Sequence, residues 1–485
     1  MNYILEGLEP KLALRYFEDI SAIPRGSYNE AGIADFIVSK ASELGLYSRR
    51  DKANNVVVKK PATKGFENCE PVLFQAHIDM VCEKNSDTVH DFTKDGLKLQ
   101  LDGDILTAKG TTLGADDGKG VAYMLALMDS DSDAFDHPPL EFLFTSGEEV
   151  GFVGAMAFDP FDLEAKKMIG LDAGPEDTVY LTSAGAQEVT FGIPYTKIPV
   201  SGTVLSLSIK GLKGGHSALK ITDELGNANK IMGRILHNVE KCVPFNICCI
   251  TGGLMFNAIP RESNAVIAVS AECVDKAKEI IAKVFEEIKV EYAASDPDVF
   301  YILEDAASEC MMDSKATKMI VDAIYNIPNG IRMMNVQIPG LPVTSTNMGV
   351  VKTLDDKVTI NTMLRSSSHT CSDDYIDNMC SIAKLCGIED IVTGSWLSAW
   401  PYMAESKLRA LAQDMYFKRH GKYMNEFAAH GGLELGVFSE KIPGLDIVTL
   451  GCDHGDEHTV TEWMSISSFE RVYNFIKDLL VELTK

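Results

Sequence analysis

The sequence has no long apolar run and no sign of an export signal. None of its apolar stretches reaches the roughly 18 residues that a membrane-spanning helix needs. Its start, MNYILEGLEP, lacks the basic segment followed by apolar residues that opens a secretory signal. We therefore expect no membrane span and no membrane partner.

Basic residues are also scarce. The chain has 45 Lys and Arg against 70 Asp and Glu, which gives a formal net charge of −25. A surface with this excess of acid repels phosphate backbones and anionic lipid. Nucleic acids are therefore excluded as the main partner.

The cysteines show no disulfide framework. There are 11 of them, an odd number, and Cys248 and Cys249 are adjacent within an apolar stretch. In a chain this long, such scattered residues are typical of reduced, buried thiols. This pattern predicts a cytoplasmic protein.

What the chain does have is enough apolar sequence for large cores. Its 485 residues are 46% apolar and 8% aromatic, which favours two or three folded domains over disorder. Residues 1–186 alternate apolar strand patterns with helix patterns, as in PVLFQAHIDM and GKGVAYMLALMDS, which indicates a parallel sheet covered by helices. A helix is expected after a capping box of Ser27 and Glu30, ending at Gly45.

The pattern changes in the middle of the chain and then returns. Residues 187–398 contain strands of alternating polarity, such as VLSLSIKG, which are typical of an antiparallel α+β domain. Residues 399–485 read as α/β again. The predicted fold is an α/β catalytic domain, with a mainly parallel sheet and helices on both faces, interrupted by an inserted α+β lid domain.

Polar residues follow the predicted parallel strands, at the sheet edge where ligands bind in α/β folds. Any one of them has an ordinary explanation, since a strand-end Asp often caps a helix and a Glu pair often lies in a solvated loop. Several clusters in corresponding places are better explained by a shared site. They are His77 and Asp79, Asp116 and Asp117, Glu148 and Glu149, Asp172, and His454 with His458.

Carboxylates gathered in this way repel one another unless cations lie between them. Imidazole and carboxylate ligands suit Zn²⁺, with Co²⁺ or Mn²⁺ as alternatives. More than four ligands suggests two divalent metal ions that share a bridging carboxylate. A self-contained metal loop that uses Cys452 is the other interpretation of CDHGDEH, although it lacks paired Cys-x-x-Cys spacing.

The sequence resembles the dinuclear-zinc exopeptidases, a family that includes aminoacylases, carnosinases and bacterial tri- and dipeptidases. The likeness covers essentially the whole chain. It depends on the Glu148–Glu149 pair and on the motifs QAHIDMV, VHDFTKD, AKGTTLGADDG, IKGLKGGHS, GNANK, NAIPRE and HGGLELG.

The resemblance implies a role for each clustered residue. Asp79 would orient the imidazole of His77 without binding the metal itself. Glu148 would bind no metal and act as the general base. His458 is favoured as the last ligand, because an acidic residue follows it in HTVTE, and His454 is its competitor. The implied metal ligands are His77, Asp116 as the bridge, Glu149, Asp172 and His458.

The resemblance also implies residues in the inserted domain. His216 would stabilise the tetrahedral oxyanion. Arg365 would pair with the substrate carboxylate, and Asn257 would help to hold the peptide. His430 and Glu434 are pocket candidates with no assigned role.

The implied activity is hydrolysis of dipeptides, including Xaa-His dipeptides, by a homodimer. A small peptide is then the substrate. An N-acyl amino acid deacylase that uses the same site is one alternative, and a non-catalytic metal-binding relative is another. Retention of Glu148 argues against the latter.

Overall fold

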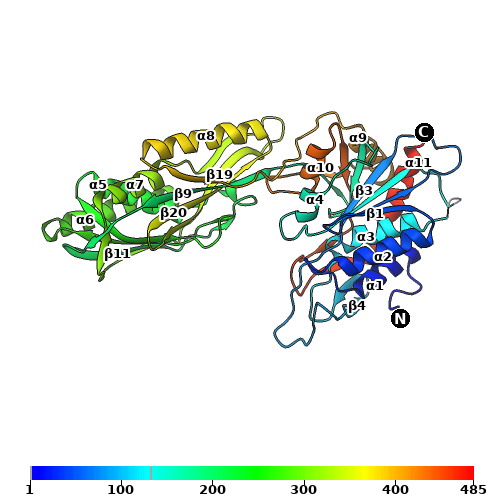
Figure 1. The fold of residues 1–485 in the computed structure, drawn as a ribbon, viewed down its shortest axis with the longest axis horizontal. Coiled ribbons are helices and arrows are strands. Elements are labelled where there is room, and N and C mark those ends of the chain that lie inside the picture. Colours follow the sequence, from blue (N-terminus) through cyan, green and yellow to red (C-terminus); the bar gives the residue numbers. More distant parts are fainter. Residues whose placement is uncertain (1–2, 132–133) are drawn as a thin grey trace. The chain divides into compact units, whose positions relative to one another are not determined.

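The computed structural model describes residues 3–131 and 134–485 and divides into two compact units, each described by itself (Figure 1). The first unit comprises Met1–Thr182, Tyr402–Phe427 and Val437–Lys485, and the second comprises Ser183–Pro401 and Ala428–Gly436. The first unit is thus built from both parts of the chain that flank the second.

The limits expected from the sequence, 1–186, 187–398 and 399–485, remain a prediction. Residues 428–436 fall in the predicted segment 399–485, but their contacts group them with the second unit.

The first unit contains a six-stranded sheet in the order β1-β2-β6-β3-β7-β23. Strands β6, β3, β7 and β23 run parallel, whereas β2 is antiparallel to both of its neighbours. Every residue of β3 and β6 is buried, as the near-continuous apolar runs predict. The mainly parallel sheet is confirmed. Its strands are β1 Tyr47–Arg50, β2 Val56–Lys60, β3 Val72–His77, β6 Leu140–Thr145, β7 Lys167–Gly170 and β23 Asp446–Thr449.

Helices and smaller strand groups complete the first unit. A four-stranded group runs in the order β24-β25-β5-β4, and β8 pairs with β22. The helices are α1 Lys11–Ser21, α2 Ala31–Glu43, α3 Ala115–Met128, α4 Val153–Ala157, α9 Lys407–His420 and α11 Ile466–Glu482, with α10 Leu435–Lys441 beginning in the second unit. The smaller strands are β4 Leu99–Asp102, β5 Ile105–Ala108, β8 Thr178–Ser183, β22 Asn425–Ala429, β24 His454–Gly455 and β25 Trp463–Ser465.

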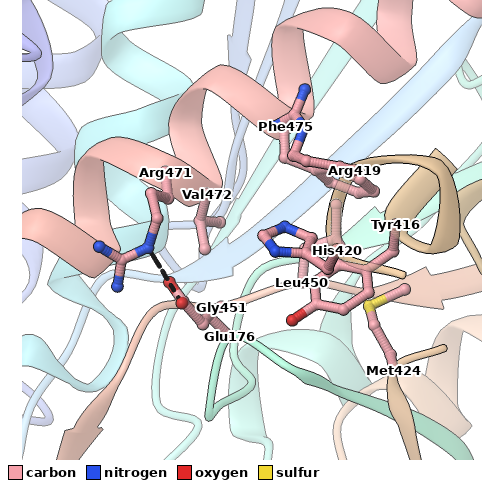
Figure 2. Close-up of a pocket in the computed structure, with 10 residues that line it drawn as sticks. All are labelled: Glu176, Tyr416, Arg419, His420, Met424, Leu450, Gly451, Arg471, Val472 and Phe475. Carbon is pink, nitrogen blue, oxygen red and sulfur yellow. Dashed lines mark hydrogen bonds and ion pairs between the residues drawn. The ribbon is translucent and has the colours of Figure 1, made fainter. Parts of the chain in front are cut away.

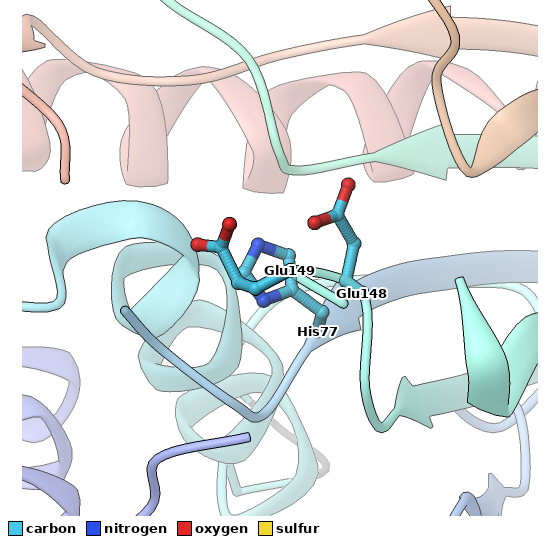
Figure 3. A group of neighbouring side chains, drawn as sticks. All are labelled: His77, Glu148 and Glu149. Atoms are coloured by element: carbon cyan, nitrogen blue, oxygen red, sulfur yellow. The ribbon is translucent and has the colours of Figure 1, made fainter. Parts of the chain in front are cut away.

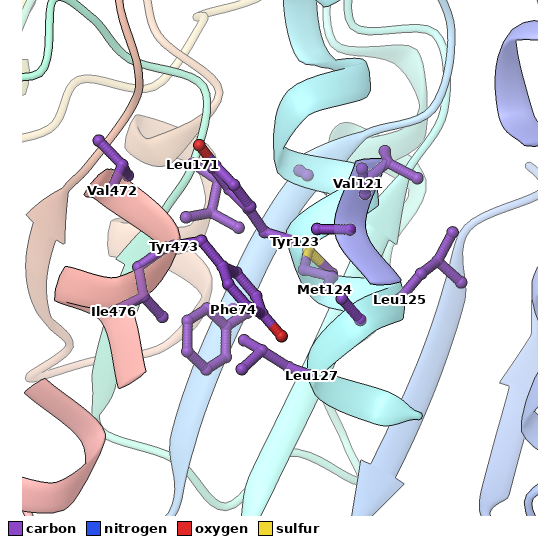
Figure 4. Packing of buried hydrophobic residues seen from close by; sticks show 14 of the residues in the cluster. Phe74, Val121, Tyr123, Met124, Leu125, Leu127, Leu171, Val472, Tyr473 and Ile476 are labelled. Atoms are coloured by element: carbon purple, nitrogen blue, oxygen red, sulfur yellow. The ribbon is translucent and has the colours of Figure 1, made fainter. Parts of the chain in front are cut away.

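Helix α3 is a core helix of the first unit. All but one of its residues are buried, and the Tyr123 ring stacks on Phe469 of α11 at a centroid distance of 4.3 Å. It also stacks on Tyr473 of α11 at 5.7 Å (Figure 4). The Tyr123 hydroxyl donates to the Phe469 carbonyl at 2.9 Å, so the buried polar atom is satisfied. Packing on this scale fixes the first turn of α3, which carries Asp116.

The beginning of α2 differs from the prediction. The helix starts at Ala31 with Glu30 at the N-cap, and the Ser27 hydroxyl donates instead to Asp79 Oδ2 at 2.8 Å. The capping-box prediction was therefore wrong, because a buried carboxylate competes for the same hydroxyl. The predicted stop at Gly45 is confirmed, with a φ of +69° directly after the helix.

The second unit contains a nine-stranded sheet whose pairings are all antiparallel, as its alternating sequence predicts. The order is β16-β11-β15-β13-β19-β20-β9-β21, and β18 also pairs with β19. Its strands are β9 Gly185–Pro194, β11 Thr203–Lys210, β13 Phe245–Gly252, β15 Ser263–Val269, β16 Phe300–Asp305, β18 Gly330–Met334, β19 Pro342–Thr353, β20 Lys357–Ser366 and β21 Asp390–Thr393.

Four helices pack against this sheet and share one apolar core with it (Figure 1). They are α5 Ala228–Glu240, α6 Val274–Glu291, α7 Ser314–Asn326 and α8 His369–Leu385, and η1 Ile221–Asp223 and η2 Ala271–Cys273 are short 3₁₀ turns. Two short strand pairs remain, β10 Lys197–Pro199 with β17 Cys310–Met312 and β12 Gly215–His216 with β14 Ala258–Ile259.

Two further expectations can be compared with the fold. All eleven cysteines are free thiols. No described helix combines the length and the apolar character that crossing a bilayer requires.

Replacing Phe142 by Ala is expected to lower the free energy of unfolding by about 3–5 kcal/mol. Its ring is fully buried and stacks on Phe74 at 5.7 Å, so the substitution leaves a cavity. Urea denaturation measures the change. The control is Val89→Ala, at a side chain that is 96% exposed. Equal losses in the two variants would contradict the packing argument.

Candidate metal centre

Acidic and imidazole side chains of the first unit gather where its parallel strands end. His77 is the last residue of β3, Glu148 and Glu149 follow β6, and Asp172 follows β7. Because β3 pairs in parallel with both β6 and β7, the carboxyl ends of the three strands lie at one edge of the sheet. The strand-end reasoning from the sequence therefore corresponds to the observed arrangement.

Asp116 lies at the centre of the group, and each of its oxygens faces a different imidazole. Its Oδ1 lies 2.9 Å from His77 Nε2, and its Oδ2 lies 3.2 Å from His458 Nε2. His458, in the loop between β24 and β25, also places Nε2 3.0 Å from Glu149 Oε2. A carboxylate that presents one oxygen to each of two nitrogen ligands has the geometry needed to bridge two cations.

The potential ligand atoms of this site form three overlapping groups, two of which contain Asp116. Asp172 lies beside His77, with its Oδ2 4.0 Å from His77 Nε2. Within each group the ligand atoms all lie within 4.8 Å of one another. The groups are His77, Asp116 and Asp172; Asp116, Glu149 and His458; and His77, Glu148 and Glu149.

Asp79 lies behind His77 and connects it to the glutamate loop. It is fully buried, and its Oδ1 is 3.5 Å from His77 Nδ1. The backbone N–H groups of Glu148 and Glu149 donate to Asp79 at 3.1 and 3.3 Å, and Ser27 donates from its hydroxyl. One carboxylate thus orients the imidazole and also holds the backbone of both glutamates.

The two adjacent glutamates point in different directions from their shared loop (Figure 3). In this view the Glu149 and Glu148 carboxylates lie on either side of the His77 ring, and Glu149 Oε2 lies 3.0 Å from His458 Nε2. Ligand atoms of both glutamates nevertheless lie within 4.8 Å of each other and of His77.

The pKa shifts show how strongly this group attracts positive charge. Burial alone would lower the pKa of His77, yet hydrogen bonds to carboxylates raise it well above its ordinary value. Hydrogen bonds to Asp116 and Glu149 raise the pKa of His458 to about 10. Burial and the charge of Asp116 raise the pKa of Asp172 well above its ordinary value. Protons offset the carboxylate charge in the chain alone, and divalent cations would replace them.

His454 lies apart from these groups. Its Nδ1 contacts the Cys452 carbonyl at 2.8 Å, and its Nε2 lies 3.1 Å from Glu457. Cys452 is fully buried, and burial raises the pKa of its thiol to about 12. A protonated thiol is a poor ligand, so the local geometry favours His458 over both competitors.

Three buried charged residues at the site were not assigned by sequence reasoning. Arg25 donates to the backbone carbonyl of Asp79, and Glu462 accepts from the backbone N–H of Asp116. Lys119 is fully buried, with Nζ 3.9 Å from Asp172 Oδ1. In the sequence, Arg25 and Lys119 could be noticed only as charged residues beside glycine, in IPRGS and DGKG. Glu462 could be noticed only as the acidic residue that ends HTVTE.

A second polar cluster lies within the second unit. Arg365 of β20 is only 7% exposed, and its Nε donates to the Ser217 hydroxyl at 3.4 Å. The Ser217 N–H donates to the Asn257 carbonyl at 2.9 Å. His216, which precedes Ser217, has its pKa lowered by burial and by Arg365. The fold therefore brings the three predicted residues of this unit together around Ser217.

His430 belongs to the same cluster. Its Nε2 lies 2.7 Å from Ser345 Oγ, and Ser345 is the cross-strand partner of Arg365. Burial and Arg365 lower the pKa of His430 to about 4, so this imidazole is neutral at pH 7. Glu434, in the same loop as His430, is also buried. Arg365 therefore supplies the fixed positive charge of the cluster.

A cavity elsewhere in the first unit adds no further catalytic group (Figure 2). Its charged lining residues are already paired, Arg471 with Glu176 at 3.0 Å and Arg419 with Asp478. The His420 ring stacks on Tyr416. None of the predicted ligands lines this cavity.

Comparison with known proteins identifies the family of the chain. The model of peptidase family M20/M25/M40 matches residues 73–482. The chain belongs to this family. It is 35% identical over 482 residues to the cytosol non-specific dipeptidase of Escherichia coli, with 99% of each chain covered.

Two solved structures share the fold. The aminoacylhistidine dipeptidase of Vibrio alginolyticus superposes with a TM-score of 0.92 at 34% identity, and the match covers 98% of this chain and 97% of that one. An aminopeptidase of Bacillus cereus gives a TM-score of 0.58 at 16% identity, covering 99% of this chain and 100% of that one, which is a likeness of fold alone.

Removing divalent cations with a chelator is expected to lower the melting temperature, because the carboxylates of the site then face one another without cations. A ligand at about 1,000 times its Kd stabilises a fold by about 4 kcal/mol. Differential scanning calorimetry of the treated chain, before and after addition of Zn²⁺, measures the change. An unchanged melting temperature would argue against a metal centre.

Proposed function

We propose that the protein is a metal-dependent dipeptidase that hydrolyses small peptides at the edge of the parallel sheet in the first unit. The observation that carries this proposal is the Asp116 carboxylate, with one oxygen toward His77 and the other toward His458. Membership of a peptidase family supports hydrolysis of an amide bond. The names of the two relatives that are about one-third identical support a dipeptide as the substrate.

The residues present fit two divalent cations. The donors are imidazole nitrogens and carboxylate oxygens, a set that suits Zn²⁺, with Co²⁺ or Mn²⁺ as alternatives. His77, Asp116 and Asp172 would hold one cation, and Asp116, Glu149 and His458 the other. The buried Glu149 Oε1 has no hydrogen-bond partner among the residues that the structure describes, which also favours an added cation. When bound, such a pair polarises a carbonyl oxygen and lowers the pKa of water.

Glu148 is proposed as the general base. Its backbone N–H donates to Asp79, and its carboxylate lies on the other side of the His77 ring from that of Glu149 (Figure 3). In this role its carboxylate removes a proton from the attacking water and passes it to the leaving amine. Asp79 keeps the His77 ring in place while charge develops at the site.

The cluster of the second unit is proposed to recognise the peptide. Among the described residues Arg365 has no carboxylate partner, and a buried guanidinium of this kind favours an anionic partner. The free carboxylate of a dipeptide supplies that anion and can accept two parallel hydrogen bonds. Asn257 would hold the peptide, and His216 would donate to the developing oxyanion.

The proposal also covers the role of the second unit, the oligomeric state and the location of the protein in the cell. The second unit would act as a lid over the substrate and as the dimerisation surface of a homodimer. Eleven free thiols and a relative named as a cytosol enzyme support a location in the cytoplasm.

Hydrolysis of a panel of dipeptides, Xaa-His among them, and of N-acetyl amino acids, each assayed with added Zn²⁺, Mn²⁺ or Co²⁺, tests the substrate class. Dipeptides are expected to be cleaved fastest. Preferential cleavage of the N-acetyl compounds would instead make the protein a deacylase. Tight metal binding without turnover of either class would indicate a non-catalytic relative.

Glu148→Gln is expected to keep its metal ions and to lose about 10²–10⁴-fold in kcat, the usual contribution of a general base. The amide cannot accept a proton, although it preserves the shape of the side chain. Metal content is measured beside dipeptide hydrolysis. A variant with full activity would remove Glu148 from this role.

Arg365→Met is expected to raise KM for a dipeptide by about 10–100-fold, since a charge-assisted hydrogen bond contributes about 1.5–3 kcal/mol. The matched control is Arg332→Met in the same unit, where the guanidinium is partly exposed and pairs with Asp374. A dipeptide amide lacks the free carboxylate, so KM for the amide is expected to change little. An equal rise in KM for the acid and the amide would contradict carboxylate recognition.

A further inference from the structure

Glu462 is a buried carboxylate that holds the loop carrying Asp116. It lies four residues after His458 and is 2% exposed. Its Oε2 accepts from the N–H groups of Leu113 and Gly114 at 2.7 and 2.9 Å, and its Oε1 accepts from the Asp116 N–H at 3.3 Å. Both oxygens are thus directed at residues 113–116, where the chain enters α3.

This loop needs an acceptor from elsewhere in the chain. The first N–H groups of a helix have no acceptor within the helix, and Gly114 adopts a left-handed φ of +64° at the N-cap of α3 without a side chain to cap it. Glu462 supplies the acceptor from 348 residues further along the chain than Gly114. The cost of burying its charge is offset by three hydrogen bonds.

Arg25 holds the same loop from its carbonyl side. The guanidinium is buried, and its Nη2 donates to the Gly114 carbonyl at 2.5 Å. Its Nη1 donates to the carbonyls of Asp79 and Ile78 at 2.9 and 3.2 Å. Arg25 therefore joins the loop that follows His77 to the Asp116 loop.

Together the two side chains form a brace, by which we mean Arg25, the loop 113–116 and Glu462. Arg25 attaches the segment 77–79 to this loop, and Glu462 attaches the segment 458–462 to it. The brace thereby connects three of the segments that carry the proposed ligands His77, Asp116 and His458. The buried charges of Arg25 and Glu462 also raise the cost of separating these segments.

We propose that Glu462 is a positioning residue for the metal centre, and that it fixes the Asp116 carboxylate between His77 and His458 before any cation binds. The inference rests on the proposed function of the site, to which it adds a residue that touches neither metal nor substrate. Asp116 belongs to both ligand groups, so a displaced loop weakens both metal positions together.

The test is Glu462→Gln, which keeps the size of the side chain. The amide oxygen can still accept from Leu113 and Gly114, but its NH₂ then faces the N–H of Asp116. Zn²⁺ titration of the chelator-stripped full chain, in competition with a chromophoric chelator, is expected to show a loss of affinity of about 10–100-fold, the usual effect of changing a group that orients a ligand. At saturating Zn²⁺, KM for a dipeptide is expected to change by less than about threefold, because the substrate contacts remain.

Glu141→Gln is the matched control. Glu141 is also a buried carboxylate of the first unit, 3% exposed, and it accepts from the N–H groups of Glu164 and Ala165 at 3.0–3.1 Å. It lies near the start of β6, at the end opposite the metal loops. This variant is expected to lower the melting temperature as Glu462→Gln does, without changing Zn²⁺ affinity.

The possible outcomes are distinct. Unchanged Zn²⁺ affinity in Glu462→Gln, or an equal loss in Glu141→Gln, would overturn the positioning role. Absence of Zn²⁺ binding by the native chain would instead overturn the proposed function, and this inference with it. If Glu462→Gln does not fold, Arg25→Lys tests the brace from its other side. A lysine keeps the positive charge but is shorter, and its single ammonium cannot replace the separate contacts of Nη1 with the Ile78 and Asp79 carbonyls and of Nη2 with the Gly114 carbonyl. The same loss of affinity is expected.

Discussion

Repulsion among carboxylates at one edge of a parallel sheet is the constraint on which the rest of this structure depends. Asp116 shares one group of side chains with Asp172 and another with Glu149, where water cannot fully screen the carboxylate charges. Without added cations the imidazoles take up protons, as the raised pKa values of His77 and His458 show. The site is therefore built to hold positive charge.

The fold supplies part of that charge itself. Arg25 and Lys119 are both buried, and both approach the loops that carry the carboxylates. Their charges are fixed by the packing of the first unit, whereas the protons on His77 and His458 can be exchanged. What remains for a ligand to neutralise is the charge between the two imidazoles, where Asp116 presents its oxygens.

The sequence predicts the strands and their ends well, because burial on both faces leaves a clear apolar run with polar residues after it. His77, Glu149 and Asp172 could be grouped in this way without any structure. The sequence could not show which histidine turns toward Asp116, since His454 and His458 lie four residues apart and only the loop geometry separates them. Its capping-box prediction for Ser27 was wrong for a related reason, because the competing acceptor, Asp79, is distant along the chain.

Arg25 and Glu462 show most clearly where sequence patterns stop being informative. Both are charged residues in loops, and such residues are usually exposed. They are buried here because each hydrogen-bonds to backbone groups of a loop far away in the chain, and backbone groups carry no sequence signal. The ligands of this site lie where strand periodicity puts them. The groups that hold those ligands at the right spacing depend on long-range backbone contacts, which only the folded chain reveals.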